Sequence, residues 1–336
     1  MGVDIQLHTF TYGRPCMKEL ERYCSRVVYY KRDTSFVNFF SWDPYIVASR
    51  DNKQLVHNLL QSESPILLEG LHCCACLEHL QGKKVFVRAH NVEHDYYRKL
   101  VDSESNLFKR LYYRVEATKL ERYEPQLLNA SCVLAVTETD ADHFKEIGCR
   151  NVVLMPSSHA DDDVVSKPGS GDYALYHADL SVAENVRAVE FIVEQLLTNA
   201  NHKLIIAGRN PDGRVVKLAE SHDNITLVPN PDDDTMHRLI ADAQVNILLT
   251  DQPTGLKLKL LTSLYAGRHC LVNSTMVHGT KLGEVCTVAD RAEELKAALD
   301  RLMSTPFTAT AIEHRKQLLG NTYSNKANAQ LLYSML

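Results

Sequence analysis

Two lysines stand at an electrically unfavourable end of an expected helix. The segment TGLKLKLLTSLYAG (Thr254–Gly267) predicts a helix that opens on Gly255 and carries Lys257 and Lys259 in its first turns. The amino end of a helix already bears partial positive charge, so cations destabilise it. An anion bound between the lysines and the free backbone N–H groups removes this conflict. Solvated lysines on an exposed helix start are the alternative. We favour the anion, which predicts a phosphate site.

A glycine and an arginine follow another expected strand, Lys203–Ala207. Gly208 permits close approach of the backbone to a ligand because it has no side chain, and the guanidinium of Arg209 suits phosphate. An ordinary strand-to-loop turn with a solvated arginine explains the pair equally well.

Histidine and carboxylate side chains follow two further strands. The segment RAHNVEHDYY delivers His90 to a strand end, with Asn91 as the expected N-cap of the next helix and Glu93 in its first turn. A histidine there can transfer a proton near neutral pH or orient a hydroxyl. From this segment alone, a histidine that satisfies a loop carbonyl is the preferred alternative. Glu69 ends the strand PILLE and could bind a polyol hydroxyl, although a capping or salt-bridged glutamate is the commoner role.

The sequence predicts no metal site. The run Asp161–Asp163 lies in a polar segment, and Asp232–Asp234 matches a helix start, where aspartate is favoured anyway. There is no dinucleotide fingerprint, Walker loop, nucleophile elbow or zincin motif. The nine cysteines show no second pair at zinc-finger spacing and suggest reduced thiols in the cytoplasm.

Composition indicates an ordinary two-domain protein. The chain has 336 residues, of which 45% are hydrophobic and 24% charged. A net charge of -5 argues against nucleic acid as a partner. No apolar run approaches the roughly 20 residues of a membrane span, and no signal peptide is apparent.

Alternating strands and helices must position these residues, and they predict an α/β fold with parallel sheets. The expected strands are Val3–His8, Arg26–Tyr30, Pro65–Glu69, Lys84–Ala89, Cys132–Val136, Val152–Met155, Ala174–His177, Lys203–Ala207, Ile225–Val228, Val245–Leu249 and Cys270–Asn273. The expected helices include Cys16–Cys24, Leu107–Leu128 (interrupted by Pro125), Glu184–Leu197 and Asp232–Ala243.

We expect two Rossmann-like, doubly wound domains. Residues 1–157 form the first, the polar segment 158–172 links them, and residues 173–319 form the second. Ligands of open α/β sheets bind outside the carboxyl ends of the strands. The cleft between the domains is therefore the expected active site.

Basic residues and tyrosines alternate along residues 98–122 and could touch an anionic membrane surface. Acidic residues nearly balance them within the same segment. We therefore favour a solvated amphipathic helix over a membrane-binding one.

Taken together, these motifs resemble the GT-B glycosyltransferases, particularly glycosyltransferase family 4, which includes bacterial mannosyl- and glucosyltransferases of surface polysaccharide synthesis. In the amino half the likeness rests on EGLH, VRAHNVEHDYY and VTETDADHF. In the carboxyl half it rests on LYHADLSVAEN, LIIAG, NITLVPNPDDDTMHRLIADAQVNILL and TGLKLKLLTSLYAGRHCLV. The last residues, 320–336, resemble the terminal helix that packs back on the first domain of this fold.

The resemblance implies a cytoplasmic enzyme, with the option of peripheral contact at the inner membrane face. It would move a hexose from a UDP- or GDP-linked sugar to a glycan or lipid-linked hydroxyl, with retention and without metal or cofactor. His90 would contact the transferred sugar. The acceptor would meet Glu69, His72, Asn91 and Glu93. The donor would meet Gly208, Arg209, Val228, Pro229, Asn230, Thr254, Gly255, Leu256, Lys257 and Lys259. Oligomeric state is left open.

The chain also departs from the family pattern. Thr262 stands near the usual ribose-binding glutamate, Ala178 replaces a glycine, and Glu184 replaces a basic residue. The fold's first strand and helix are expected to be missing before GVDIQLHTF. These departures support an alternative, a catalytically weakened GT-B protein that acts as a carbohydrate-binding or partner subunit. A non-hydrolysing sugar epimerase on the same fold is a poorer alternative.

Overall fold

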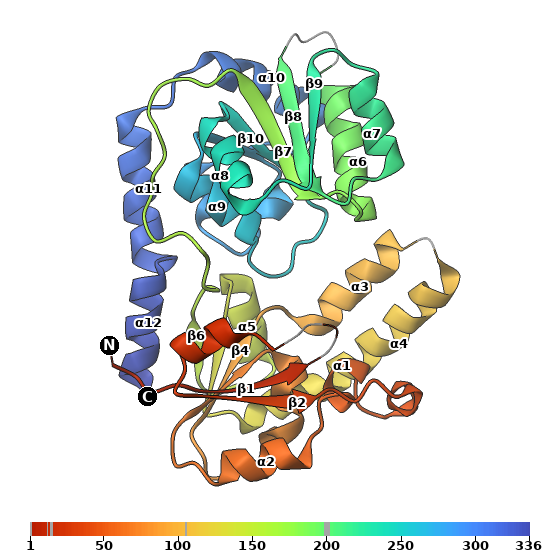
Figure 1. Ribbon diagram of the computed structural model, residues 1–336, viewed down its shortest axis with the longest axis vertical. Coiled ribbons are helices and arrows are strands. Elements are labelled where there is room, and N and C mark those ends of the chain that lie inside the picture. The colour runs from red at the N-terminus through yellow and green to blue at the C-terminus, as the bar shows by residue number, and fades with distance from the viewer. Residues whose placement is uncertain (1, 12, 14–15, 105, 198–201) are drawn as a thin grey trace. The chain divides into compact units, whose positions relative to one another are not determined.

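A computed structural model describes residues 2–11, 13, 16–104, 106–197 and 202–336 (Figure 1). The chain divides into two compact units. The first comprises Met1–Val136 and Asp140–Leu154, and the second comprises Thr137–Thr139 and Met155–Leu336. Among the described residues, no helix is both long and apolar enough to cross a membrane.

The first unit contains a four-stranded parallel sheet in the order β3-β4-β5-β6. Its strands are β3 (Ile66–Glu69), β4 (Val85–Ala89), β5 (Cys132–Ala135) and β6 (Val152–Leu154). The continuous apolar runs of β4 and β5 are buried, as central strands of parallel sheets are. β1 (Gln6–Thr11) and β2 (Arg26–Lys31) also pair in parallel, but they form a separate two-stranded sheet rather than extending the larger one.

Helices and 3-10 helices surround these sheets. They are η1 (Lys18–Arg22), η2 (Phe36–Phe40), α1 (Tyr45–Ala48), α2 (Lys53–Leu60), η3 (Leu71–His79), α3 (Glu93–Ser103), α4 (Leu107–Tyr123), η4 (Glu124–Asn129) and α5 (Glu138–Glu146). The helix expected over Cys16–Cys24 is the shorter η1. The expected interruption at Pro125 is confirmed: α4 ends at Tyr123, and the proline lies in the first turn of η4.

The second unit contains a six-stranded parallel sheet in the order β12-β11-β10-β7-β8-β9 (Figure 1). Its strands are β7 (Tyr173–Asp179), β8 (Lys203–Arg209), β9 (Ile225–Pro229), β10 (Val245–Leu248), β11 (His269–Val272) and β12 (Thr287–Val288). Chain order runs outward in one direction from β7 and in the other from β10. The sheet is therefore doubly wound, and its topological switch point lies between β7 and β10.

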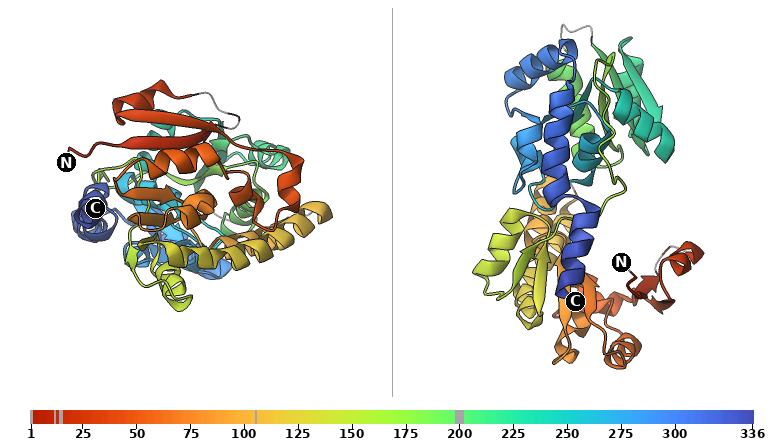
Figure 2. Two further views of the ribbon diagram at one scale, coloured as in Figure 1. Left: turned by 90° about the horizontal axis from the view of Figure 1, so that it is seen from below. Right: turned by 90° about the vertical axis from the view of Figure 1, so that its left-hand side faces the viewer.

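Helices cover both faces of this sheet, because right-handed crossovers place them on opposite sides as the winding direction reverses. They are α6 (Ala183–Phe191), the π-helix η5 (Ile192–Leu196), α7 (Gly213–Glu220), α8 (Asp233–Asp242), α9 (Leu258–Ala266), η6 (Ser274–Val277), η7 (Leu282–Val285), α10 (Ala292–Ser304), α11 (Ala309–Thr322) and α12 (Asn325–Met335). α11 leads directly into α12 (Figure 2).

Two helix starts differ from expectation. α9 begins at Leu258, with Lys257 as its N-cap, rather than on Gly255. Gly255 has φ of +68°, so the chain makes a left-handed turn there before it can enter the helix. α3 begins at Glu93 with Val92 as its N-cap and no side-chain cap, so the N-cap role expected for Asn91 is wrong.

The polar segment 158–172, expected to link the two domains, makes specific contacts within the second unit. The backbone N–H of His159 donates to Asn325 Oδ1 (3.1 Å), and Asn325 Nδ2 donates to the carbonyl of His159 (2.8 Å). Ser166 is buried and its hydroxyl lies against the end of α9. These hydrogen bonds are long-range and leave no local pattern in the sequence.

Candidate functional site

A loop follows β10 at the switch point of the second unit. Thr250 Oγ1 donates to Glu184 Oε1 (2.6 Å), and the backbone N–H of Asp251 donates to the same oxygen (2.7 Å). Glu184 lies in the first turn of α6, where a carboxylate is stabilised by the helix dipole. Glu184 therefore holds the start of this loop through two hydrogen bonds.

Two polar atoms of this loop are buried without a hydrogen bond. Gln252 Oε1 and Thr254 Oγ1 have no hydrogen-bond partner within the described parts of the chain. Buried polar atoms are nearly always satisfied, so these two atoms of one loop are candidates to bind a polar ligand. Thr254 is among the residues that the sequence assigned to the donor.

Both lysines of the expected anion site contact backbone carbonyls. Lys257 Nζ folds back and donates to the carbonyls of Thr254 (2.5 Å) and Gly255 (2.9 Å). Lys259 Nζ lies 3.5 Å from the carbonyl oxygen of Leu249 at the end of the sheet, and 5.8 Å from the centre of the Tyr176 ring. Burial lowers the pKa of Lys259, and Glu184 partly opposes this.

His177 on β7 belongs to the same edge and was missed by sequence reasoning. Its Nε2 lies 3.2 Å from Ser263 Oγ. Burial, reinforced by Lys259, lowers the pKa of His177 to about 3, so its imidazole is neutral at physiological pH. The only sequence signal was its place at the end of the strand YALYHAD.

The remaining donor-site candidates lie together on neighbouring strands. Gly208, the next-to-last residue of β8, lies opposite Pro229 on β9. The backbone N–H of Asn230 donates to the carbonyl of Gly208 (2.8 Å), and Asn230 has φ of +49°. A Cβ on Gly208 would lie 1.8 Å from the carbonyl oxygen of Ala178, so this glycine is required by the close approach of β7 and β8. Arg209 is exposed beside it.

In the first unit, the ends of β3 and β4 bring an acid and a histidine into contact. Glu69 Oε2 lies 3.3 Å from His90 Nε2, and Glu69 Oε1 lies 3.4 Å from an Arg88 guanidinium nitrogen. The strand register places Glu69 opposite Arg88. A carboxylate in this position fixes the orientation and the tautomer of the imidazole.

A glycine with φ of +99° brings His72 to the same group. A Cβ on Gly70 would lie 2.5 Å from His72 Cε1 and 3.4 Å from His90 Cδ2. The absent side chain is what allows both rings to lie beside the β3 end. The structure thus gathers Glu69, His72 and His90, which are separated in the sequence, and Arg88 is a member that sequence reasoning missed.

Burial and mutual charge set the protonation of this group. Burial alone would raise the pKa of Glu69, but the hydrogen bond from His90 and the charge of Arg88 hold it below its ordinary value. Burial and the nearby Arg50 lower the pKa of His72 to about 4. Burial, with Glu124 and Asp140 adding to it, raises the pKa of Glu93 to about 7 despite His90. Near neutral pH the group thus holds an ionised acid, a neutral imidazole and a half-protonated carboxyl.

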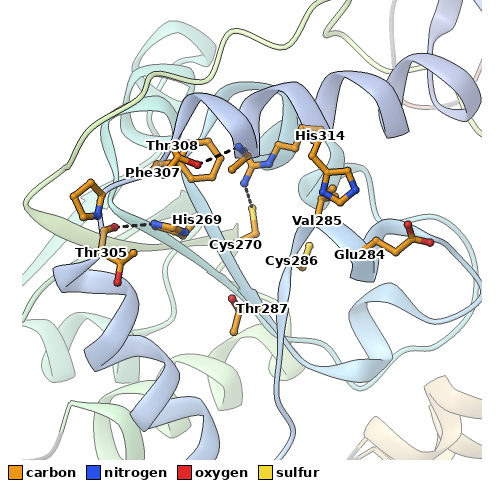
Figure 3. A pocket seen from close by; sticks show the side chains of 13 residues that line it. His269, Cys270, Glu284, Val285, Cys286, Thr287, Thr305, Phe307, Thr308 and His314 are labelled. Atoms are coloured by element: carbon orange, nitrogen blue, oxygen red, sulfur yellow. Dashed lines mark hydrogen bonds between the residues drawn. The ribbon is translucent and has the colours of Figure 1, made fainter.

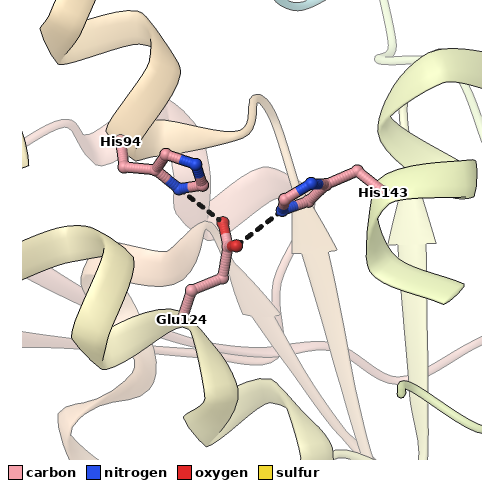
Figure 4. Close-up of side chains that lie close together, drawn as sticks. All are labelled: His94, Glu124 and His143. Carbon is pink, nitrogen blue, oxygen red and sulfur yellow. Dashed lines mark hydrogen bonds and ion pairs between the residues drawn. The ribbon is translucent and has the colours of Figure 1, made fainter. Parts of the chain in front are cut away.

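The first unit contains a second cluster of titratable side chains, made of two histidines and a glutamate. His94, Glu124 and His143 offer ligand atoms that all lie within 4.8 Å of one another (Figure 4). His143 Nε2 lies 2.6 Å from Glu124 Oε2, and His94 Nδ1 lies 3.4 Å from Glu124 Oε1. The contact with Glu124 raises the pKa of His143. The 2.6 Å contact between η4 and α5 is typical of a charge-assisted hydrogen bond, and His94 on α3 adds a longer ion-pair contact to the same carboxylate.

A pocket in the second unit lies at the opposite end of the sheet. It is lined by residues of β11, α11 and the segments near them, including His269, Cys270, Phe307 and Arg315 (Figure 3). His269 is the first residue of β11, so this pocket lies at an amino end of the strands. Ligands of doubly wound sheets bind at the carboxyl ends, so we do not assign the donor here.

Comparison with known proteins identifies the fold. No family model matches the chain. An uncharacterized 44.6 kDa protein in the cps region of Klebsiella pneumoniae is 23% identical over 322 residues, which are 90% of this chain and 79% of that protein.

Three kinds of solved structure illustrate the structural likeness. A trehalose-6-phosphate synthase, studied as an enzyme of glycosyl transfer with retention, has a TM-score of 0.58 and 11% identity over 84% of this chain and 76% of its own. The catalytic domain of starch synthase IV from Arabidopsis thaliana, bound to ADP and acarbose, has a TM-score of 0.56 and 10% identity (89% and 77%). A mutant of TarM from S. aureus, bound to UDP and fondaparinux, has a TM-score of 0.59 and 11% identity (83% and 57%). The chain has the GT-B fold of these glycosyltransferases.

Proposed function

We propose that the protein is a retaining glycosyltransferase that moves a hexose from a nucleotide-diphosphate sugar to a hydroxyl of a glycan or lipid-linked acceptor, without a metal. The observation that carries the proposal is the loop at the β7/β10 switch point. It presents buried, unsatisfied polar atoms of Gln252 and Thr254 beside two lysines. The solved structures of the same fold that contain UDP or ADP support the same class of donor.

On this proposal the loop binds the diphosphate. The N–H groups of Gly255 and Leu256 and the hydroxyl of Thr254 donate to phosphate oxygens. Lys257 exchanges its contacts with the loop carbonyls for the phosphate, because an anionic phosphate oxygen attracts the ammonium more strongly than a neutral carbonyl does. Lys259 and Lys257 then stabilise the negative charge that develops on the leaving nucleotide.

The nucleoside would lie along the ends of β8 and β9. Gly208 and Arg209 face the diphosphate side, and the backbone of Val228, Pro229 and Asn230 contacts the base. The hydrogen bond that Asn230 donates to the Gly208 carbonyl holds these two strand ends together.

The group on the first unit would handle the sugar and the acceptor. His90 contacts the transferred hexose, and Glu69 orients His90 through their 3.3 Å contact. The neutral ring of His72 and the side chains of Asn91 and Glu93 bind acceptor hydroxyls. A carboxyl with a pKa of about 7, such as that of Glu93, is suited to exchange a proton with a hydroxyl near neutral pH.

We assign the reaction to the cytoplasm, with the acceptor presented at the inner face of the membrane. The relative from the cps region of Klebsiella pneumoniae supports a role in surface polysaccharide assembly. UDP and GDP sugars are both retained as candidate donors.

The experiment that tests the proposal separates chemistry from donor binding. His90→Ala should abolish transfer and donor hydrolysis while leaving the affinity for the nucleotide, measured by calorimetry, within about two-fold, since His90 touches the sugar alone. Equal loss of both would give His90 a structural role.

A weakened, sugar-binding protein is the second candidate. The acidic Glu184 beneath the donor loop favours it, because a carboxylate near the diphosphate reduces the positive potential there. Slow hydrolysis of a sugar nucleotide by the native protein, absent in His90→Ala, would exclude this candidate.

A further inference from the structure

Large apolar side chains of the first unit project into solvent on two adjacent segments. In and after η2 they are Phe36, Val37, Phe40 and Trp42, and on α4 they include Phe108 and Leu111. Trp42 is 84% exposed and Phe108 is 86% exposed. Contiguous apolar side chains of this size are rare on soluble surfaces and mark sites of interaction. We call these six residues and the basic residues of α4 the aromatic–basic surface.

Specific contacts hold η2 against α4 with its rings outward. The ring of Phe39 stacks on Tyr45 with 4.3 Å between centroids. Lys119 Nζ donates to the carbonyl of Phe39 (3.0 Å), and the guanidinium of Arg122 lies 5.7 Å from the centre of the Trp42 ring. A shallow groove lined by residues of both segments runs between them. The exposed rings are therefore fixed in place by the fold.

The exposed charge of this surface is positive, although the whole chain carries a net charge of -5. Glu116 on α4 is 1% exposed, and its carboxylate accepts from the backbone N–H of Tyr45 (2.6 Å) and pairs with Lys119 (3.0 Å). Glu121 pairs with Arg98 at 2.7 Å. α4 nevertheless carries five basic residues and two acidic ones, so its net charge is positive.

The basic side chains remain at the surface. Lys109, Arg110, Arg114 and Arg122 lie on α4 among the exposed apolar residues. The near balance of charge expected along residues 98–122 argued against a membrane-binding helix. Within α4 itself, five basic residues stand against two acidic ones, so the objection does not hold for this helix.

We propose that the aromatic–basic surface docks the first unit on an anionic lipid bilayer. Trp42, Phe40 and Phe108 would enter the headgroup region, where aromatic rings are enriched, and the arginines would contact lipid phosphates. Interfaces between proteins are also enriched in aromatic residues and arginine, so a soluble protein partner is the competing occupant; its binding would not depend on anionic lipid. This inference does not require sugar transfer, and its test measures binding alone.

The chain provides its own probe, because Trp42 is its single tryptophan. The full protein is titrated with phosphatidylcholine vesicles that contain or lack phosphatidylglycerol. Anionic vesicles should shift the Trp42 emission to the blue, and brominated acyl chains in those vesicles should quench it. The protein should also co-sediment with anionic vesicles, and added salt should weaken this binding. Emission that does not respond to anionic vesicles, or responds equally to neutral ones, overturns the proposal.

Paired variants separate charge from insertion. Arg110→Glu with Arg114→Glu should weaken binding by at least roughly ten-fold, since each basic residue near an anionic surface contributes about five-fold. Phe40→Ser with Phe108→Ser should remove the quenching by brominated chains. The matched controls, Arg150→Glu and Tyr23→Ser, alter exposed side chains of the same unit outside the surface and should bind as the native protein does.

A second copy of this chain is another candidate occupant of the surface, and the fluorescence experiment detects it. A blue shift that grows with protein concentration in the absence of lipid, together with a dimer in sedimentation, would assign the surface to a second copy and overturn the proposal. Melting temperatures of all variants, compared with that of the native protein, show whether lost binding reflects lost folding.

Discussion

Arg315 is a buried cation that closes the carboxyl end of the lysine-bearing helix α9. It is 1% exposed and donates to the carbonyls of Leu264 (3.2 Å), Gly267 (2.6 Å) and Arg268 and to Ser166 Oγ (3.1 Å). The last carbonyls of a helix lack partners within it and carry partial negative charge, which a guanidinium satisfies. Arg315→Met should therefore destabilise the second unit more than any loss of packing alone.

The magnitude follows from the partners left behind. Each buried carbonyl without a donor costs about 1–3 kcal/mol. Three carbonyls lose a donor here, but loss of the buried charge returns part of the cost, so we expect about 4 kcal/mol. For a unit of this size each kcal/mol lowers the Tm by about 2–4 °C, which gives a fall of roughly 10 °C.

Differential scanning calorimetry of the full chain measures this fall. Arg315→Lys should lie between the native protein and Arg315→Met, because one ammonium cannot reach all the carbonyls. Arg301→Met, an exposed arginine of α10, should change the Tm by less than about 2 °C. If Arg315→Met also changes the Tm by no more than this control, the hydrogen bonds of Arg315 do not support α9 and the reasoning is wrong.

Two further predictions concern the first unit. Gly70→Ala should lower the stability of this unit by about 1–3 kcal/mol, because φ is +99° and the new Cβ would meet the His72 ring at 2.5 Å. The same change should reduce sugar transfer without changing nucleotide affinity. An unchanged urea midpoint would contradict the geometry. The pKa of Glu93 is about 7 in the folded protein, against an ordinary value of 4.5, so the folded state binds the proton more tightly than the unfolded state does. The free energy of unfolding that this proton contributes is therefore lost as pH rises from about 4.5 to 7. Glu93→Gln should remove up to about 3 kcal/mol of that pH dependence in urea unfolding measured below about pH 5 and above about pH 8, and an unaltered pH dependence would show that Glu93 is not buried in this way.

The sequence predicted the elements of the fold because periodicity and apolar runs are local signals. Buried central strands such as Val245–Leu248 stand out as continuous apolar runs between polar turns. The separate sheet of β1 and β2 left no such signal, because the choice of neighbouring strand depends on contacts between residues far apart in the sequence. The start of α9 at Leu258 was missed because the left-handed turn at Gly255 competes with the helix.

The site was predicted in part, for the same reason. Strand ends identified Glu69 and His90, because residues at carboxyl ends meet at one edge of a sheet. Arg88 and His177 escaped notice, because their roles come from neighbours on other strands. The near balance of charge expected along residues 98–122 hid the excess of basic residues within α4, because the bounds of that helix are not marked in the sequence.

The central claim is that a nucleotide diphosphate binds the loop between β10 and α9, and thermal unfolding with UDP and GDP tests it most directly. A ligand at about 100 times its Kd stabilises the native state by about 2.7 kcal/mol, so one nucleotide at millimolar concentration should raise the Tm by several degrees. Lys257→Ala with Thr254→Ala should abolish most of this rise, whereas Lys167→Ala, an exposed lysine elsewhere in the second unit, should retain it. A Tm that neither nucleotide raises, or a rise that survives loss of Lys257 and Thr254, would contradict the account.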